Sequence, residues 1–456
     1  MVQSQHEKQL KMTTAPVEKL VLKLAAPTII SMLVTTFYNM ADTFFVGKLN
    51  NTSATGAVGV VFSLMAIIQA VGFYFGHGSG NFISRKLGEE NVGEAETMAS
   101  CGFFYALMGG ATITLFGFLF INPLATLLGA TETIKPYAVD YMSIILIGAP
   151  YMCASLVLNN QLRYQGNAFF AMLGLVTGAL VNIGLDPLFI FVLDMGVSGA
   201  ALATVISQAI SFIILWIGCQ KSDNLKIKIK RFTFKLRYFT QIARGGLPSL
   251  MRQGLASVAT MMLNNVVGAY GDAAVAAMSI VTRITVFLGS AMLGFGQGFQ
   301  PVCGFNYGAE KFDRVKKAFL FCIQVGTLFL LIVSAIMFIL SPQLIALFQA
   351  NDQTVIEIGS VVLRCQLCSL PLAATIIMTN MMYQTIGKVG GATVLAMARQ
   401  GIFFIPAVLL LPLAFGIWGV YVAQCFSDVL AFSIAVPLIV VEFKDMTRLG
   451  QITVSS

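Results

Sequence analysis

The stretch GVSGAALATVISQA at residues 196–209 returns 220 residues later as GIWGVYVAQCFSDV at residues 416–429. Two glycines, an alanine and a serine keep their places between the two copies. Further pairs at an offset of 220 or 221 are Pro27 and Pro248, Gly88 and Gly308, Asn159 and Asn380, and Gly166 and Gly387. A repeat that extends along most of a chain indicates an architecture of two similar halves.

The composition around this repeat is typical of a membrane protein. Of the 456 residues, 57% are hydrophobic and 11% are charged, whereas soluble domains carry about 25% charged residues. Apolar runs long enough to cross a bilayer recur along the chain, unlike the short alternating segments of an outer-membrane barrel. We therefore predict an all-α integral membrane protein with twelve transmembrane helices. The predicted spans are 25–46, 57–83, 98–120, 137–159, 168–193, 197–218, 245–268, 273–302, 318–340, 355–380, 390–412 and 416–440.

A basic segment, KSDNLKIKIKRFTFKLRYF at 221–239, separates six predicted spans from six others. An even number of spans gives both halves the same orientation, so the repeat is parallel. In transporters, such repeats form two bundles that rock against each other around a site between them. The predicted division is an N-terminal cytoplasmic segment 1–23, a six-helix bundle 24–218, a cytoplasmic basic linker 219–244, a six-helix bundle 245–440 and a cytoplasmic tail 441–456.

The basic residues predict the orientation in the membrane. Lys and Arg outside the spans gather on the side of the termini, with eight in the segment 221–244 and Arg163 between the fourth and fifth spans. Only Lys48 and Lys135 fall on the other side. By the positive-inside rule, both termini of this multi-pass chain are predicted in the cytoplasm. Topology thus explains the net charge of +8, which does not indicate a nucleic-acid partner.

Two aspartates are predicted at membrane depth in the first half. Asp42 lies nineteen residues past Lys23, about 28 Å along a helix, which places it in the outer half of the first span. Asp186 lies in the outer half of the fifth span, and Asn182 is one turn earlier on the same face. Thr204 lies at a similar depth on the sixth span. These four polar side chains are therefore predicted at one level.

Two carboxylates at one low-dielectric level cannot both be ionised without a counter-charge. Either one carboxylate holds a proton or a cation sits between the two, and both arrangements amount to an ion-linked switch. Separate hydrogen bonds between helices are the alternative explanation of such polar side chains. Pro187 directly follows Asp186, and its ring is expected to loosen the preceding turn and to leave carbonyl groups free.

Three stretches carry a family resemblance: PTIISMLVTTFYNMADTFFVG (27–47), NIGLDPLF (182–189) and GVSGAALAT (196–204). Together with the double six-span layout, they resemble the MATE family, the multidrug and toxic compound extrusion transporters. Within this family the chain looks most similar to the bacterial branch of MepA-like and DinF-like pumps. The resemblance covers about residues 15–440. It implies two bundles in a V around a central cavity, and antiport of organic cations and amphiphilic drugs against H⁺ or Na⁺ without a cofactor.

The resemblance also implies roles for individual residues. The coupling side chains of relatives match Asp42, Asn182, Asp186 and Thr204. These are the four residues that the depth estimate selects, and they would be the metal ligands if Na⁺ is the coupling ion. A first-span proline that is implicated in helix bending matches Pro27.

The second half departs from the pattern of NorM-type relatives. Its seventh span, GGLPSLMRQGLASVATMMLNN (245–265), lacks the glutamate that forms a second cation site in those proteins, so such a site is not expected. The residues Arg252, Arg283, Arg364 and Arg399 lie within spans instead, and their roles stay open. Arg399 and Asp428 would either form an ion pair that neutralises charge or line the substrate path.

The substrate cavity is expected to be wide, apolar and adaptable. The chain has 36 Phe and 22 Met residues, and methionine surfaces accommodate ligands of varied shape. The candidate cavity residues are Tyr38, Asn39, Asn159, Gln253, Arg283, Arg399 and Asp428. The expected partners are small-molecule drugs or organic cations and the lipid bilayer, with no nucleic acid, and the chain is expected to act as a monomer.

Two other functions are weighed against drug efflux. A lipid-linked oligosaccharide flippase of the same superfamily would need a strongly cationic cavity, and the intramembrane arginines keep it open as the alternative. An enzyme would need a nucleophile with a base or a metal cluster, but the histidines are His6 and His77 and there is no HExxH or GxSxG motif. Cys365 and Cys368 form a CxxC on an apolar helix, where a redox or metal role is not expected. We therefore expect no enzyme activity.

Overall fold

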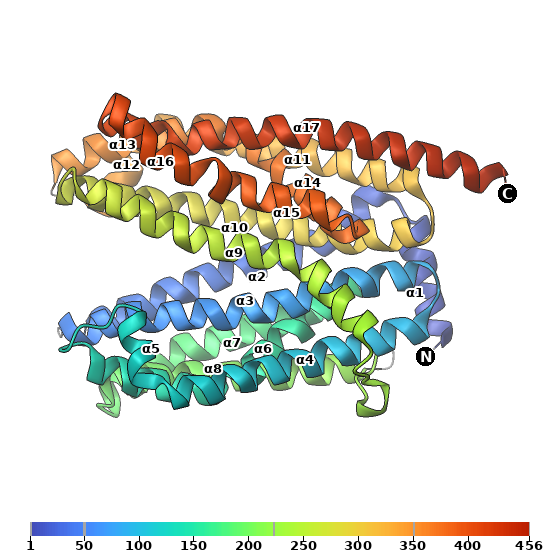
Figure 1. Ribbon diagram of the computed structural model, residues 1–456, viewed down its shortest axis with the longest axis horizontal. Coiled ribbons are helices and arrows are strands. Elements are labelled where there is room, and N and C mark those ends of the chain that lie inside the picture. Colours follow the sequence, from blue (N-terminus) through green and yellow to red (C-terminus); the bar gives the residue numbers. More distant parts are fainter. Residues whose placement is uncertain (1, 49–51, 222–223, 350–351, 456) are drawn as a thin grey trace.

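The structure consists of two helical bundles, one from each half of the chain. The computed structural model describes residues 2–48, 52–221, 224–349 and 352–455. All regular structure in these ranges is helical, which confirms the predicted all-α fold. Figure 1 shows the first half as one bundle and the second half as the other, with both termini at the same end of the molecule.

The first bundle is built from six long helices and two short ones. Its helices are α1 (Val2–Thr14), α2 (Val17–Gly47), α3 (Thr52–Gly88), α4 (Val92–Leu119), α5 (Ile121–Leu127), α6 (Lys135–Tyr164), α7 (Ala168–Pro187) and α8 (Gly196–Gln220). A π-helical turn, Leu188–Val192, extends α7 beyond Pro187. The linker contains one 3-10 turn, Ile229–Arg231.

The second bundle repeats this order of long and short helices. It contains α9 (Leu236–Gly268), α10 (Asp272–Gly308), α11 (Phe312–Ile339), α12 (Ser341–Ala346), α13 (Gln353–Ser369), α14 (Leu372–Ile386), α15 (Val389–Met397), a π-helical segment Ala398–Ile402, α16 (Phe404–Phe415) and α17 (Ile417–Ser455). α3 and α10 both have 37 residues, and α4 and α11 both have 28. The predicted parallel repeat therefore has a direct counterpart in helix length.

The number of membrane-crossing helices is consistent with twelve. In the described part of the chain, ten helices are long and apolar enough to cross a bilayer. The pair α13 and α14, bent by 53° at its junction, brings the number to eleven if it is counted as one broken span. α9 has 33 residues but is less apolar, because it carries Arg237, Arg244 and Arg252. Its length and its place beside α3 and α15 are consistent with a twelfth span.

Backbone conformation at the helix ends reproduces the repeat. Gly196 and Gly416, 220 residues apart, have φ of 55° and 56°. Glu90 and Glu310, also 220 residues apart, have φ of 60° and 57°, a conformation that residues with a side chain rarely adopt. Because the same unusual turn recurs at equivalent positions, the two halves share local geometry as well as helix order.

Close crossings of α3, α9, α10 and α2 join the bundles toward the end that carries the termini. A Cβ atom on Gly78 of α3 would collide with the carbonyl oxygen of Ile242 on α9. At the equivalent place, a Cβ on Gly298 of α10 would collide with Ala25 of α2. Glycine permits the backbones to approach this closely, as small residues do in membrane helix interfaces.

Gly78→Ala is expected to weaken this closure, because an added Cβ must displace the backbone of α9. Overpacking of this kind costs about 1–3 kcal/mol, which lowers the melting temperature by a few degrees. The matched control is Gly59→Ala in the same helix, since no described atom outside the neighbouring turns of α3 lies within 4 Å of a Cβ built there. Thermal melting of the two purified variants makes the comparison, and equal melting temperatures would contradict the proposed role of Gly78.

Short segments at this end differ in detail from the predicted division. α1 lies within the predicted cytoplasmic segment 1–23 and bonds both halves, because Gln9 donates to the carbonyl of Gly88 at 3.3 Å and Asn306 donates to that of Met12 at 3.1 Å. α9 begins at Leu236, inside the predicted linker, so the helix extends beyond its apolar part. The predicted domain limits themselves stay a proposal.

Candidate functional site

Three of the four predicted coupling residues meet in a buried group of the first bundle. Asn182 on α7 donates from Nδ2 to Oδ1 of Asp186, one turn further along, and to Oγ1 of Thr204 on α8, at 3.4 Å in each case. The exposed fractions of Asn182, Asp186 and Thr204 are 1%, 0% and 3%. Within the described ranges, Oδ1 of Asn182 has no hydrogen-bond partner. The polar triad formed by these residues is therefore a carboxylate, an amide and a hydroxyl held away from water.

The fourth predicted coupling residue is Asp42. Its backbone belongs to α2, which packs against α7, but the side chains of Asp42 and Asn39 lie outside the described part of the structure. The pairing of Asp42 with Asp186 therefore stays a prediction. Pro27 is a half-buried residue inside the same helix, and its carbonyl accepts a hydrogen bond from Ser31 at 2.8 Å.

The polar triad has the chemistry to hold a proton or a small cation. The amide of Asn182 now donates toward Asp186, which suits an ionised carboxylate. If the amide of Asn182 rotated by about 180°, its Oδ1 would replace Nδ2 beside Oδ1 of Asp186 and Oγ1 of Thr204. Oxygen atoms of three residues would then be neighbours. Such oxygens suit a hard cation. Across the described residues, no cluster of three His, Cys, Asp or Glu side chains exists that would hold a transition metal.

The π-helical turn after Pro187 lies directly beside the polar triad. Leu193 donates to the carbonyl of Leu188 at 2.9 Å, five residues back, in place of the usual α-helical bond. π-helical turns occur often at functional sites because they widen the helix locally. The sequence predicted that Pro187 would loosen the turn before it, whereas the irregular turn follows it.

A small pocket adjoins the polar triad at Thr204. Its volume of about 20 Å³ is enough for one water molecule. Thr204 lines it together with Tyr38 of α2, Gln69 of α3 and Tyr141 of α6. Tyr38 and Gln69 also line the large cavity described next. Thr204 is therefore the member of the polar triad that faces this pocket, and Tyr38 and Gln69 are polar residues that the pocket shares with the cavity.

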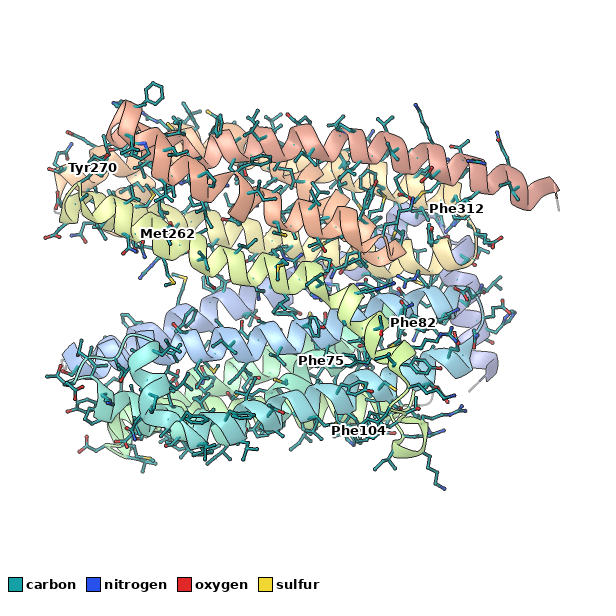
Figure 2. All side chains as sticks on the ribbon, in the orientation of Figure 1. Phe75, Phe82, Phe104, Met262, Tyr270 and Phe312 are labelled. Atoms are coloured by element: carbon teal, nitrogen blue, oxygen red, sulfur yellow. The ribbon has the colours of Figure 1, made fainter. Side chains whose placement is uncertain are left out.

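A cavity of about 1860 Å³ lies between the two bundles. Lys48 and Leu127, which line it, stand at the end of the molecule opposite the termini, where Figure 2 shows the two bundles diverging. Its apolar wall contains six methionines and three phenylalanines, and these are Met32, Met40, Met65, Met152, Met261, Met292, Phe44, Phe62 and Phe73. A space this large and adaptable can hold amphiphilic molecules of varied shape.

Most of the predicted cavity residues line this space. They are Tyr38, Asn159, Gln253, Arg283, Arg399 and Asp428. Asn39 lies outside the described side chains. Asn159 and its repeat partner Asn380 both donate to a carbonyl twelve residues on, Asn159 to Ala171 at 2.8 Å and Asn380 to Ala392 at 2.6 Å. These two asparagines therefore also brace the helices that carry them.

Arg399 and Asp428 form an ion pair and also line the cavity. Nε of Arg399 lies 2.7 Å from Oδ1 of Asp428, whose side chain is 2% exposed. Asp428 accepts two further hydrogen bonds, from Gln424 at 2.9 Å and from Ser369 at 3.0 Å. The two residues thus form the ion pair that the sequence offered as one alternative, and the other alternative, a place on the substrate path, stays a prediction.

A polar network at the inner end of the cavity was not predicted from the sequence. Arg163, expected in a loop, lies instead on α6 and is 2% exposed. Its guanidinium donates to Gln297 of α10, to Asn160 at 2.5 Å and to Nε2 of His77 at 3.3 Å. The loop assignment was wrong because α6 continues through Tyr164, past the end of its apolar run.

The network crosses from the first bundle to the second. Because arginine can only donate, Nε2 of His77 accepts, and Nδ1 donates to Ser249 on α9 at 3.0 Å. Ser249 also accepts from Gln384 on α14 at 2.8 Å. The repeat pairs Arg163 with Gln384, and His77 with Gln297, so the sequence did contain a signal for this network.

Comparison with known proteins places the whole chain in one family. The MatE family model matches residues 27–188 and again residues 248–409. The multidrug export protein MepA of Staphylococcus aureus is 28% identical over 435 residues, which are 94% of this chain and 95% of the relative.

Two solved structures show the same fold. A multidrug resistance MATE family transporter of the MOP superfamily, in an outward-facing conformation, has a TM-score of 0.91 at 27% identity, covering 96% of this chain and 98% of that one. A MOP superfamily transporter from Pyrococcus furiosus, whose binding pocket is described as reversed in polarity, has a TM-score of 0.89 at 27% identity and the same coverage.

The two matched segments fall on the two bundles and begin at the paired prolines, Pro27 and Pro248. They span well over half of the chain, and the first contains Asp42, Asn182 and Asp186. The relatives are transporters, which points to a membrane protein that moves small molecules and away from an enzyme. The chain therefore belongs to the MatE family and is a MATE transporter similar to MepA.

Proposed function

We propose that this chain exports amphiphilic drugs from the bacterial cytoplasm in exchange for H⁺ or Na⁺, by alternating access. The observation that carries this proposal is the buried polar triad of Asn182, Asp186 and Thr204, because Thr204 lines a small pocket that shares Tyr38 with the drug-sized cavity. An intramembrane carboxylate with oxygen neighbours is suited to bind and release a small cation.

The proposed cycle begins in the conformation described here, with the cavity open opposite the termini. Asp186, together with Asp42, takes up H⁺ or Na⁺ in this state. Neutralising the carboxylates changes the packing of α2 near Pro27, and the drug leaves. On the other side of the membrane the ion is released and the next drug enters. The ion must bind the two conformations with different affinity, because otherwise it drives nothing.

The remaining assignments belong to the same proposal. Both termini lie in the cytoplasm, the membrane is the bacterial inner membrane, and the functional unit is a monomer with the domain limits predicted above. Asp42, Asn182, Asp186 and Thr204 would be the ligands if the ion is Na⁺. Export of organic cations, which the family resemblance implies, has less support, since the described wall of the cavity is rich in arginine.

Ion-driven transport in proteoliposomes tests this proposal. Two probes share one fluorescent ring system and differ in head group, namely (pyren-1-ylmethyl)trimethylammonium and pyrene-1-sulfonate. We expect an imposed pH gradient or an imposed sodium gradient, applied one at a time, to drive at least one probe, and an ionophore that collapses the gradient to stop it. Movement of neither probe under either gradient would contradict ion-coupled export.

A further inference from the structure

The described wall of the central cavity carries more positive than negative charge. Its basic residues are Lys48, Arg163, Arg252, Arg283 and Arg399, and its acidic residue is Asp428. Asp428 is bound to Arg399, so this pair is neutral. The remaining four cations have no ion pair with any described residue. Asp42, whose side chain lies outside the description, can contribute at most one negative charge.

Arg252 and Arg163 stand out among these cations because both lie at the inner end of the cavity. Arg252, on α9, donates from Nη1 to Oδ1 of Asn380 at 3.2 Å, which is a neutral partner. The partners of Arg163 are neutral as well, and its Nε is buried without a hydrogen-bond partner in the described ranges. Arg163 is joined to α9 through His77 and Ser249, and Ser249 lies one turn before Arg252, so the two guanidinium groups bring like charges to the same end of the cavity.

Two such charges are costly where water is scarce. A buried cation normally has a carboxylate beside it, and one without such a partner retains much of its desolvation penalty. An oxyanion between the two guanidinium groups would balance these like charges and would offer a hydrogen-bond partner to Nε of Arg163. Guanidinium groups bind planar or tetrahedral oxyanions in paired hydrogen bonds, which favours this class of ligand over a halide.

The neighbouring wall determines what such an anion would be attached to. Met32, Met292 and Phe73 belong to the same cavity, so an apolar body can pack while its head group lies at the arginines. We propose that the cavity recognises amphiphiles with an anionic head group of the sulfonate, phosphate or carboxylate type, bound by Arg252 and Arg163. This rests on the proposed function, and it names the substrate class of the same site.

Equilibrium binding to the full chain in lipid nanodiscs tests this inference, with the two pyrene probes and with empty nanodiscs as blank. We expect pyrene-1-sulfonate to bind more tightly than the trimethylammonium probe. In Arg252→Gln, sulfonate affinity should fall about tenfold or more, because a hydrogen bond to a charged group is lost. Affinity for the trimethylammonium probe should stay unchanged or rise, which also shows that the variant is folded. Arg252→Lys should retain part of the sulfonate affinity.

The matched control is Arg364→Gln. Arg364 is an intramembrane arginine that donates to the carbonyl of Phe338 at 3.2 Å and does not belong to the described cavity wall. The Arg364→Gln variant should bind both probes with the same affinity as the native chain. Tighter binding of the trimethylammonium probe to the native chain, or equal sulfonate affinity in Arg252→Gln and Arg364→Gln, would overturn the inference. If the inference were overturned in either way, gradient-driven transport of the trimethylammonium probe would still support the proposed ion-coupled export.

Discussion

Asp186→Asn is expected to reduce ion-driven efflux to the level of empty liposomes, while membrane insertion and folding persist. Asparagine has nearly the same shape as aspartate, and its amide oxygen can still accept from Asn182, which also donates to Thr204 on α8, so the packing of α7 against α8 survives. It cannot change its charge, and therefore it cannot bind the coupling ion in one conformation and release it in the other. The same loss is expected of Asp42→Asn. Transport of the pyrene probes in proteoliposomes is the measurement.

Asp140→Asn is the control for this experiment. Asp140 is an exposed acid of α6, so its neutralisation removes the same charge away from the polar triad. It should transport at the native rate. Undiminished ion-driven efflux by Asp186→Asn would refute the assignment of the coupling site, and the fold and family would be unaffected.

Arg399→Met is expected to cause the largest loss of stability among single changes in the second bundle. It leaves the carboxylate of Asp428 buried in the membrane without its cation. Breaking a buried ion pair costs about 3–5 kcal/mol, and the bonds from Gln424 and Ser369 should hold the loss near the lower value. The unfolding midpoint of the purified variant is the measurement.

A double variant separates lost charge balance from lost packing. Arg399→Met combined with Asp428→Asn removes both charges. The amide oxygen of the new side chain can accept from Gln424, and its amide nitrogen can donate to the hydroxyl of Ser369, so most of the stability should return. Asp313→Asn is the exposed control, because the carboxylate beside Lys316 is 99% exposed and its pair should be worth under about 1 kcal/mol. A single Arg399→Met variant as stable as the native chain would show that the pair contributes little.

Much of the architecture could be predicted because it depends on features that a sequence displays directly. Glycines at positive φ, such as Gly196 and Gly416, mark equivalent turns in the two halves, and hydropathy marks the spans between them. Depth along a helix and the spacing of Asn182 and Asp186 were enough to place those residues in one group with Thr204. Such predictions succeed where local rules determine the geometry.

The inner network could not be predicted by the same rules. Hydropathy ends a span where polar residues begin, so Arg163 was assigned to a loop, although α6 continues and its polar groups are satisfied by Gln297 of the other bundle. The start of α9 was missed for a related reason, since its first turns are basic and lie outside the apolar run. Contacts between the bundles join residues that are far apart in the sequence, and a hydropathy profile carries no information about such pairs.

The central claim is that a small cation in the polar triad determines toward which side the chain opens. It can be measured with spin labels at Leu127 and Leu347, which are exposed and occupy equivalent places on the two bundles at the end opposite the termini. The background would lack Cys365, Cys368 and Cys425, the cysteines that are not fully buried. We predict that the distance distribution between the labels shifts when pH is lowered or Na⁺ is added, and that it stays fixed in Asp186→Asn. A native distribution that responds to neither ion, or an equal shift in Asp186→Asn, would contradict the claim.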